Sequence, residues 1–243
     1  MARSIDDNNN AFNKMLKFIL QRVQQNVLSL SATGVLFFAF AGTLKIWGFW
    51  IYAAVVLTYQ IVSLLIIVPR YPSYPELARI RKIQRPDGKK WDRLIVRLLM
   101  LATFLIYILA AIDLGRLHRC LLPLWMTPIG MLFYAAGSAL NQWAMIHNPH
   151  FEKEVRIQSD RDHQVIAVGP YRHVRHPGYL GSVLGFVSYP LLFGSALAFV
   201  GSSFCIAGMI MRTYLEDRAL HEELDGYRQY CQRVPYRLLP FVW

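Results

Sequence analysis

The chain has 243 residues, of which 55% are hydrophobic, and 26 Lys and Arg residues against 15 Asp and Glu residues give a formal net charge of +11. The apolar residues form long uncharged blocks, whereas a soluble helix keeps one polar face, so the pattern excludes a soluble globular protein. The cations lie between these blocks and not in one basic domain, which argues against a partner of the nucleic-acid class.

Residues 1–27 are predicted to form an amphipathic helix at the membrane interface. The opening MARSIDDNNN is polar, and no short apolar core with a cleavage site follows it, so we do not expect it to act as a secretory signal. Apolar side chains then recur at helical spacing with Lys14, Lys17 and Arg22 between them. An extension of the first span on the cytoplasmic side is the alternative. The apolar positions are Phe12, Met15, Leu16, Ile19, Leu20, Val23 and Val27.

Five uncharged blocks predict an all-α, polytopic transmembrane helix bundle with five to six spans. They cover residues 28–44, 46–68, 98–112, 120–146 and 177–211. Block 46–68 reaches roughly 34 Å as a helix, enough to cross a hydrocarbon core of about 30 Å. Block 177–211 is too long for one ordinary span and carries Pro190 and Gly194 near its middle, so we expect a helical hairpin.

The cations predict the orientation of these spans. All Lys and Arg residues except Lys45, Arg116 and Arg119 lie before the first span or in segments 70–97, 153–175 and 212–237. This is the positive-inside asymmetry, so both termini and both large loops are expected to face the cytoplasm. Loop 70–97, within a membrane region 28–146, shows no catalytic constellation and is predicted to be solvated and to face membrane lipid headgroups.

The polar chemistry is concentrated in region 147–243, on both sides of the expected hairpin. Two histidine pairs, His147 with His150 and His173 with His176, are interrupted by proline or arginine, and no HExxH pattern occurs, so no metal site is expected. The sequence also lacks a GxSxG elbow and a P-loop. We therefore expect a reaction whose donor arrives already activated, so that the protein mainly positions two partners.

The stretch GPYRHVRHPGYLG, residues 169–181, is interpreted as an anion cradle at the start of a helix. Arg172, His173, Arg175 and His176 supply donors, and Pro177 can occupy the first helical position with backbone N–H groups nearby. Across the hairpin, Arg212 and Glu216 are four residues apart and share one helix face.

These motifs carry a family resemblance. The series QSDRDHQVIAVGPYRHVRHPGYLG and RTYLEDRALHEELDGYRQYCQRVPYRLLP resembles the isoprenylcysteine carboxyl methyltransferase family of membrane proteins, which is itself similar to phospholipid N-methyltransferases. The resemblance implies S-adenosylmethionine as cofactor, held between a cytoplasmic loop and the last helix. It also implies a hydrophobic or lipid-linked methyl acceptor that enters from the bilayer, most simply a carboxylate.

The resemblance also assigns roles to particular residues. Arg212 would orient the acceptor, and Glu216 would bind a polar group of the cofactor. The remaining cofactor contacts would be Gln158, His163, Gln164, Val165, Ile166 and Tyr171, followed by the RHPxY element His176, Pro177, Gly178 and Tyr179. The paired glutamates of the family appear here as Glu216 and Asp217, and the N-terminal spans do not match a pocket for a prenyl chain.

A second enzyme class shares part of this pattern. Membrane sterol and steroid reductases that use NADPH have a similar RHxxYxG-like element, an acidic pair and a YxxYxxxVxYRxxP-like tail. Pro177 and the spacing of Arg212 and Glu216 favour the methyltransferase.

Overall fold

The computed structural model describes residues 2–71, 74–76, 88–119, 121–152 and 154–243, with side chains from residue 12 onward except that of Ser159. Within these residues the fold is helical, and the β interactions are limited to one isolated bridge between Leu121 and Ser195. The longer helices are α1 (Ala2–Ala41), α2 (Trp47–Arg70), α4 (Lys90–Ile112), α5 (Met126–His147), α6 (Pro177–Phe193) and α7 (Ala198–Glu223). Shorter elements are the π-helical turn η1 (Asp113–Leu117), the 3-10 turns η2 (Ser159–Arg161) and η3 (Gly169–Arg172), and α8 (Tyr227–Arg233). The expected all-α class is confirmed.

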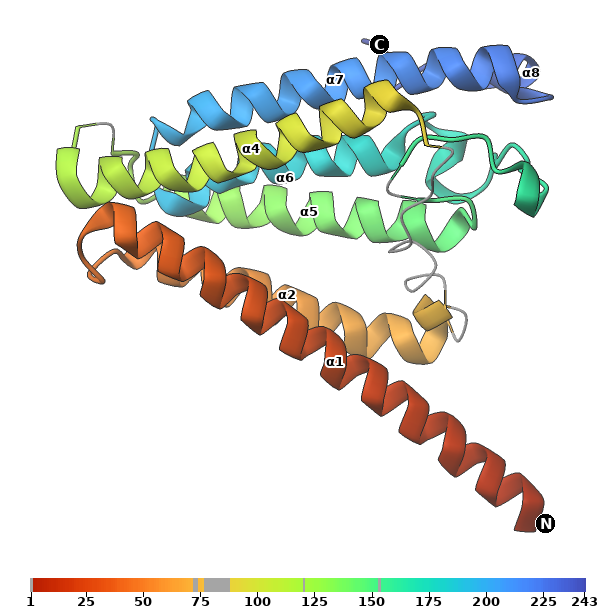
Figure 1. Ribbon diagram of the computed structural model, residues 1–243, viewed down its shortest axis with the longest axis horizontal. Coiled ribbons are helices and arrows are strands. Elements are labelled where there is room, and N and C mark those ends of the chain that lie inside the picture. Colours follow the sequence, from red (N-terminus) through yellow and green to blue (C-terminus); the bar gives the residue numbers. More distant parts are fainter. Residues whose placement is uncertain (1, 72–73, 77–87, 120, 153) are drawn as a thin grey trace.

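The helices form a bundle with one splayed pair. Helices α4, α5, α6 and α7 lie side by side, with α5 packed on α6 and α4 packed on α7 (Figure 1). Helices α1 and α2 join this bundle at one end and diverge from it toward the other (Figure 1). The buried cluster that joins them contains Phe37 of α1, Phe49 of α2, Ile106 of α4 and Phe193 of α6.

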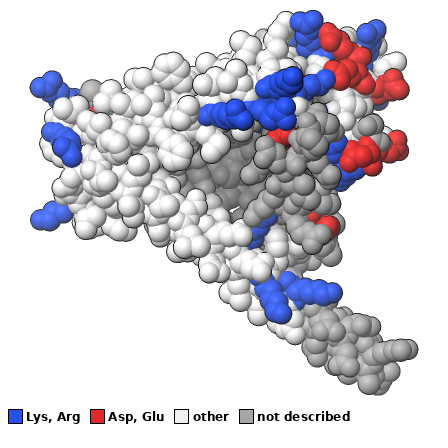
Figure 2. Space-filling view, in the orientation of Figure 1, with Lys and Arg blue, Asp and Glu red and all other residues white. Residues whose placement is uncertain are grey.

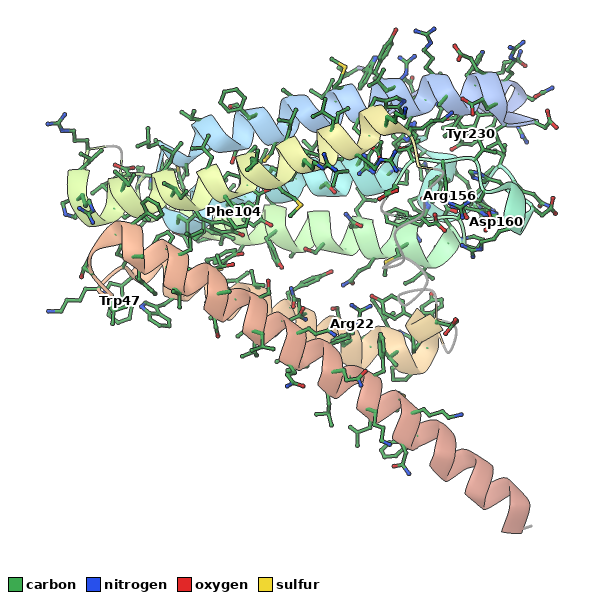
Figure 3. All side chains as sticks on the ribbon, in the orientation of Figure 1. Arg22, Trp47, Phe104, Arg156, Asp160 and Tyr230 are labelled. Carbon is green, nitrogen blue, oxygen red and sulfur yellow. The ribbon has the colours of Figure 1, made fainter. Side chains whose placement is uncertain are left out.

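The chain is an integral membrane protein. Among the described residues, four helical segments are long and apolar enough to cross a membrane: Phe12–Ala41, Trp47–Arg70, Lys90–Leu117 and Ala198–Glu223. On the face seen in Figure 2, an uncharged belt separates an end rich in both signs of charge from an end with a few Lys and Arg residues. Trp47 lies near the sparsely charged end and Arg156 and Tyr230 near the other (Figure 3). The number of crossings, five or six, stays a prediction.

The N-terminal segment is not separated from the first span. Helix α1 runs without interruption from Ala2 to Ala41, which matches the alternative of a helical extension. Its position relative to the membrane surface stays a prediction.

The expected hairpin is confirmed between α6 and α7. Pro177 occupies the first turn of α6, where a missing N–H costs nothing, and Pro190 lies in its last turn. Gly194 ends the helix with φ +77°, a left-handed conformation that glycine adopts without strain, and its N–H donates to Pro190 O at 2.9 Å. Helix α7 then begins at Ala198.

The start of α4 corrects the interpretation of segment 70–97. Residues 90–97 are helical, and Asp92 in the first turn of α4 is fully buried, with 0% of its surface exposed. The part of the predicted loop at residues 72–73 and 77–87 lies outside the described residues. The sequence pattern missed Asp92 because its cationic neighbours, Lys89, Lys90 and Arg93, indicate a solvated segment.

Close packing of α5 on α6 fixes where the second half of the chain enters the bundle. A Cβ atom at Gly181 would lie 2.5 Å from Gly137 O, so only glycine permits this approach. At Gly178 a Cβ atom would meet the ring of Phe151 at 2.6 Å. The first turns of α6 therefore lie directly against the end of α5.

Candidate functional site

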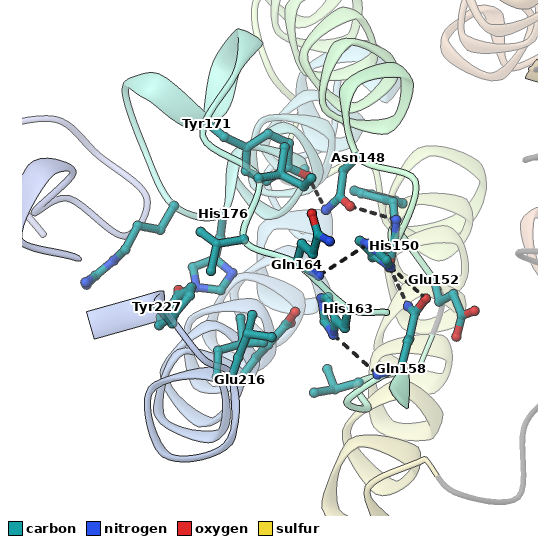
Figure 4. A pocket seen from close by; sticks show the side chains of 18 of the residues that line it. Asn148, His150, Glu152, Gln158, His163, Gln164, Tyr171, His176, Glu216 and Tyr227 are labelled. Carbon is teal, nitrogen blue, oxygen red and sulfur yellow. Dashed lines mark hydrogen bonds between the residues drawn. The ribbon is translucent and has the colours of Figure 1, made fainter. Parts of the chain in front are cut away.

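A polar pocket lies where α5 ends and α6 begins. It has an empty volume of about 820 Å³ that is partly open to solvent, and it is enclosed by loop 148–176, the first turns of α6, the last turns of α7, and α8. Figure 4 shows how side chains from the loop and from α7 converge on this pocket.

Ten of the eleven residues that the resemblance assigns to the cofactor line this pocket. The exception is Pro177, which is buried in the first turn of α6, and Arg212 is also absent from the lining. The ten are Gln158, His163, Gln164, Val165, Ile166, Tyr171, His176, Gly178, Tyr179 and Glu216.

One wall is a hydrogen-bonded group around Gln158, which is 2% exposed. Its amide Nε2 donates to His150 O at 2.7 Å, and its backbone N–H donates to His163 Nδ1 at 3.3 Å (Figure 4). The rings of His150 and His163 lie 4.5 Å apart. Burial, with further contributions from His150 and Arg156, lowers the pKa of His163 to about 4, so its ring is neutral at pH 7 and can accept this bond. From the sequence, His150 was considered only as a possible metal ligand.

Ion pairs hold the first part of the loop. The Arg156 guanidinium is buried and pairs with Glu152 through Nε at 2.9 Å and with Asp160 through Nη1 at 2.7 Å. Glu154 also lines the pocket, and its Oε2 is buried without a hydrogen-bond partner among the described residues.

Asp217 is the centre of a buried polar cluster behind the pocket. Its Oδ2 accepts from Arg237 Nε at 2.8 Å, and its Oδ1 accepts from the Tyr227 hydroxyl at 2.9 Å and lies 3.3 Å from His176 Nε2. Burial and the Asp217 charge raise the pKa of Tyr227, so this hydroxyl stays protonated. Arg175 Nε lies 3.1 Å from Asp217 Oδ1 as an ion pair without hydrogen-bond geometry. Sequence reasoning missed Tyr227 and this role of Asp217.

The proposed anion cradle is assembled only in part. Arg175 and His176 line the pocket, but both lie against the Asp217 carboxylate, which offsets their charge. Arg172 and His173 are exposed and do not line the pocket. The motif correctly predicted a turn followed by the start of a helix. Its spacing could not show which of its side chains point into the pocket.

Glu216 and Tyr179 form the wall next to α7. The Tyr179 hydroxyl donates to the Glu216 carboxylate, and the Arg212 guanidinium lies over the Tyr179 ring, 5.0 Å from its centroid. Arg212 is 9% exposed and makes a two-point pair with Asp92, through Nε to Oδ1 at 2.7 Å and Nη2 to Oδ2 at 3.1 Å. Arg212 and Glu216 thus share a helix face as expected, and a carboxylate of α4 holds the arginine.

These features define a membrane-embedded helical protein with a polar ligand pocket at one end of its bundle. Residues 129–222, from α5 to the end of α7, match the model of the isoprenylcysteine carboxyl methyltransferase (ICMT) family. The family resemblance drawn from the motifs is therefore confirmed over this segment, which contains all the residues that the resemblance assigned.

Curated relatives match between 33% and 47% of the chain. The Protein-S-isoprenylcysteine O-methyltransferase of Schizosaccharomyces pombe is 28% identical over 111 residues, which are 42% of this chain and 45% of that protein. A probable Protein-S-isoprenylcysteine O-methyltransferase of Oryza sativa subsp. indica is 25% identical over 122 residues, 47% of this chain and 61% of that protein. The Delta(14)-sterol reductase of Mus musculus is 30% identical over 83 residues, 33% of this chain and 20% of that protein. The chain thus spans between one fifth and about three fifths of the length of these relatives.

Proposed function

We propose that the protein is an integral membrane methyltransferase that transfers the methyl group of S-adenosylmethionine to a hydrophobic or lipid-linked acceptor. The single observation that carries this proposal is the convergence of ten separately assigned residues on one pocket within the family-matched segment. The pocket and both termini are proposed to face the cytoplasm, because most of the cations lie in the segments at that end.

The chemistry of the pocket fits this cofactor. S-adenosylmethionine carries an amino group, an adenine amine and ribose hydroxyls, which are hydrogen-bond donors that suit the carboxylate of Glu216 in the pocket lining. Its flat adenine ring suits the aromatic and aliphatic lining formed by Tyr171, Val165 and Leu220. Region 147–243 would be the cofactor-binding part, and region 28–146 would supply the remaining membrane helices.

The proposed reaction requires positioning more than acid or base chemistry. When bound, the cofactor would supply a methyl carbon activated by a positively charged sulfur, and this sulfur would leave as a neutral thioether when an oxygen nucleophile takes the methyl group. An acceptor carboxylate is ionised at neutral pH and needs no general base, whereas an amine acceptor would need one. Arg212 would orient the acceptor carboxylate, and the buried pocket walls would exclude water.

The test of this proposal is calorimetry of the detergent-purified protein with S-adenosylmethionine, S-adenosylhomocysteine and NADPH. The two sulfur-containing ligands are expected to bind, and NADPH is not. The second candidate function is an NADPH-dependent reductase, because the chain is similar to a Delta(14)-sterol reductase. Binding of NADPH alone would support this second candidate. Transfer of labelled methyl groups into a membrane lipid extract would then identify the acceptor class.

A further inference from the structure

The buried carboxylate of Asp92 connects three elements at the edge of the pocket. Its Oδ1 accepts from Arg212 Nε, and its Oδ2 accepts from Arg212 Nη2 and from the backbone N–H of Val155 at 2.8 Å. A carboxylate without exposed surface is costly unless it is paired in this way. Asp92 lies on α4, outside the segment that matches the ICMT family, so the comparisons assign it no role.

The pair with Asp92 fixes the plane of the Arg212 guanidinium. Two parallel N–H···O contacts hold one edge of the group, and the Tyr179 ring covers its face. An arginine side chain on a single contact can rotate about its last bonds, whereas this fork allows one orientation. The guanidinium of Arg212 is therefore held in one orientation beside a residue that lines the pocket.

The same carboxylate holds the loop that forms the opposite wall. Besides the bond from Val155 N–H to Asp92, the backbone N–H of Lys89 donates to Val155 O at 2.9 Å. Val155 lines the pocket together with its neighbours Glu154 and Arg156. Asp92 thus sets the distance between the loop wall and Arg212.

We propose that Asp92 is a positioning residue for methyl transfer, which acts by orienting Arg212 toward the acceptor at a fixed distance from the cofactor loop. This inference rests on the proposed function. Asp92 also provides Arg212 with a counter-charge other than Glu216, which lies one helical turn away on the same face. Glu216 therefore keeps its carboxylate for the pocket.

The test uses Asp92→Glu, which keeps the charge but displaces the guanidinium by the length of one methylene group. Single-turnover methyl transfer at saturating donor and acceptor is expected to slow at least tenfold, while S-adenosylhomocysteine affinity changes less than threefold. Lys89→Met is the matched control, because Lys89 Nζ, at the N-cap of α4, and Glu223 Oε1, at the end of α7, form a partly exposed pair 2.6 Å apart, and the substitution keeps the backbone N–H that bonds Val155 O. The control is expected to transfer at the wild-type rate.

A double-mutant cycle separates positioning from a general structural role. If Asp92 acts through Arg212, the transfer rate of Asp92→Glu with Arg212→Lys is no slower than that of Arg212→Lys alone. A ¹⁵N spectrum of labelled arginine should also show the Arg212 Nε–H signal shifted in Asp92→Glu and unchanged in Lys89→Met.

Two results would overturn the positioning role without affecting the proposed methyltransferase function. The first is a double variant in which the two rate reductions multiply, and the second is a Lys89→Met protein that transfers methyl groups as slowly as Asp92→Glu. A wild-type protein that binds neither S-adenosylmethionine nor S-adenosylhomocysteine would overturn the proposed function, and the positioning role with it.

Discussion

Two neighbouring acidic residues on α7 have different environments. Successive residues on a helix point about 100° apart, and Glu216 faces the pocket while Asp217 faces the cluster of His176, Tyr227 and Arg237. Where the family has two neighbouring glutamates, this chain has Glu216 and Asp217, so the two differ at Asp217. A short side chain is sufficient there because its partners already approach within hydrogen-bond distance.

Glu216→Gln is expected to weaken S-adenosylhomocysteine binding roughly tenfold to a hundredfold, because a charged hydrogen bond contributes about 1.5 to 3 kcal/mol. The fold should persist, since Glu216 packs no core and Tyr179 can still donate to the amide oxygen. Calorimetry measures the affinity, and Glu222→Gln, which removes an exposed pair with Arg218, is the control. Equal affinities of Glu216→Gln and wild type would remove Glu216 from the binding site.

His163 should make the pocket sensitive to acid. Its pKa is lowered from 6.5 to about 4, so between these values the unfolded chain binds a proton that the folded chain does not. Stability therefore falls as the pH decreases from about 6.5 to about 4 and is independent of this group above that window. Burial also lowers the pKa of His150, which adds an effect of the same sign.

The variant His163→Asn keeps an acceptor for the Gln158 N–H but cannot titrate. Melting temperatures of both proteins across pH 4 to 7.5 should show a smaller acid loss in the variant. Parallel curves would mean that His163 does not carry this dependence.

At the scale of helices, the sequence predicted those features that depend on residues close together in the chain, such as where a helix begins and ends. Pro177, Pro190 and Gly194 marked the ends of α6 because each restricts or permits a local backbone conformation. The continuous helix α1 was one of two alternatives, and the burial of Asp92 was missed, because burial depends on packing partners distant in the sequence. The close approach of α5 and α6 was missed for the same reason.

Gly181→Ala should destabilise the contact between α5 and α6, because its Cβ would lie 2.5 Å from Gly137 O and 3.0 Å from Asn141 N. Overpacking of this kind costs about 1 to 3 kcal/mol. Gly185→Ala, one turn further along α6, is the control because no atom lies within 4 Å of its added Cβ. Thermal unfolding in detergent should rank Gly181→Ala below Gly185→Ala, and the reverse order would contradict this packing.

Over the whole molecule, the site combines a segment that the family shares with a helix that it does not cover. The resemblance identified ten of the 22 residues that line the pocket, because its motifs are local in the sequence, on the loop and on α6 and α7. It could not identify Asp92, Tyr227 or Arg156 as partners, since these contacts join residues whose spacing has no pattern. The motif also did not reveal that Arg172 and His173 are exposed.

The orientation in the membrane is open to a direct test. In a variant whose three cysteines are replaced, single cysteines at Lys45 and Pro235, both exposed, report on opposite ends of the bundle. A membrane-impermeant maleimide added to intact cells should label position 45 and leave position 235 unlabelled until the membrane is permeabilised. Labelling of position 235 in intact cells would show that the protein has the opposite orientation in the membrane.

Helix α6 is short for its setting. Its 17 residues reach only about 26 Å, against a hydrocarbon core of about 30 Å, and the pocket begins at its first turn. If α6 crosses the membrane as proposed, local thinning of the leaflet around it would relieve this mismatch and bring the headgroup region close to the depth of the pocket. An amphiphilic acceptor could then present its polar end to the pocket while its chain stays in the lipid, so that the proposed reaction would not have to extract the substrate into water.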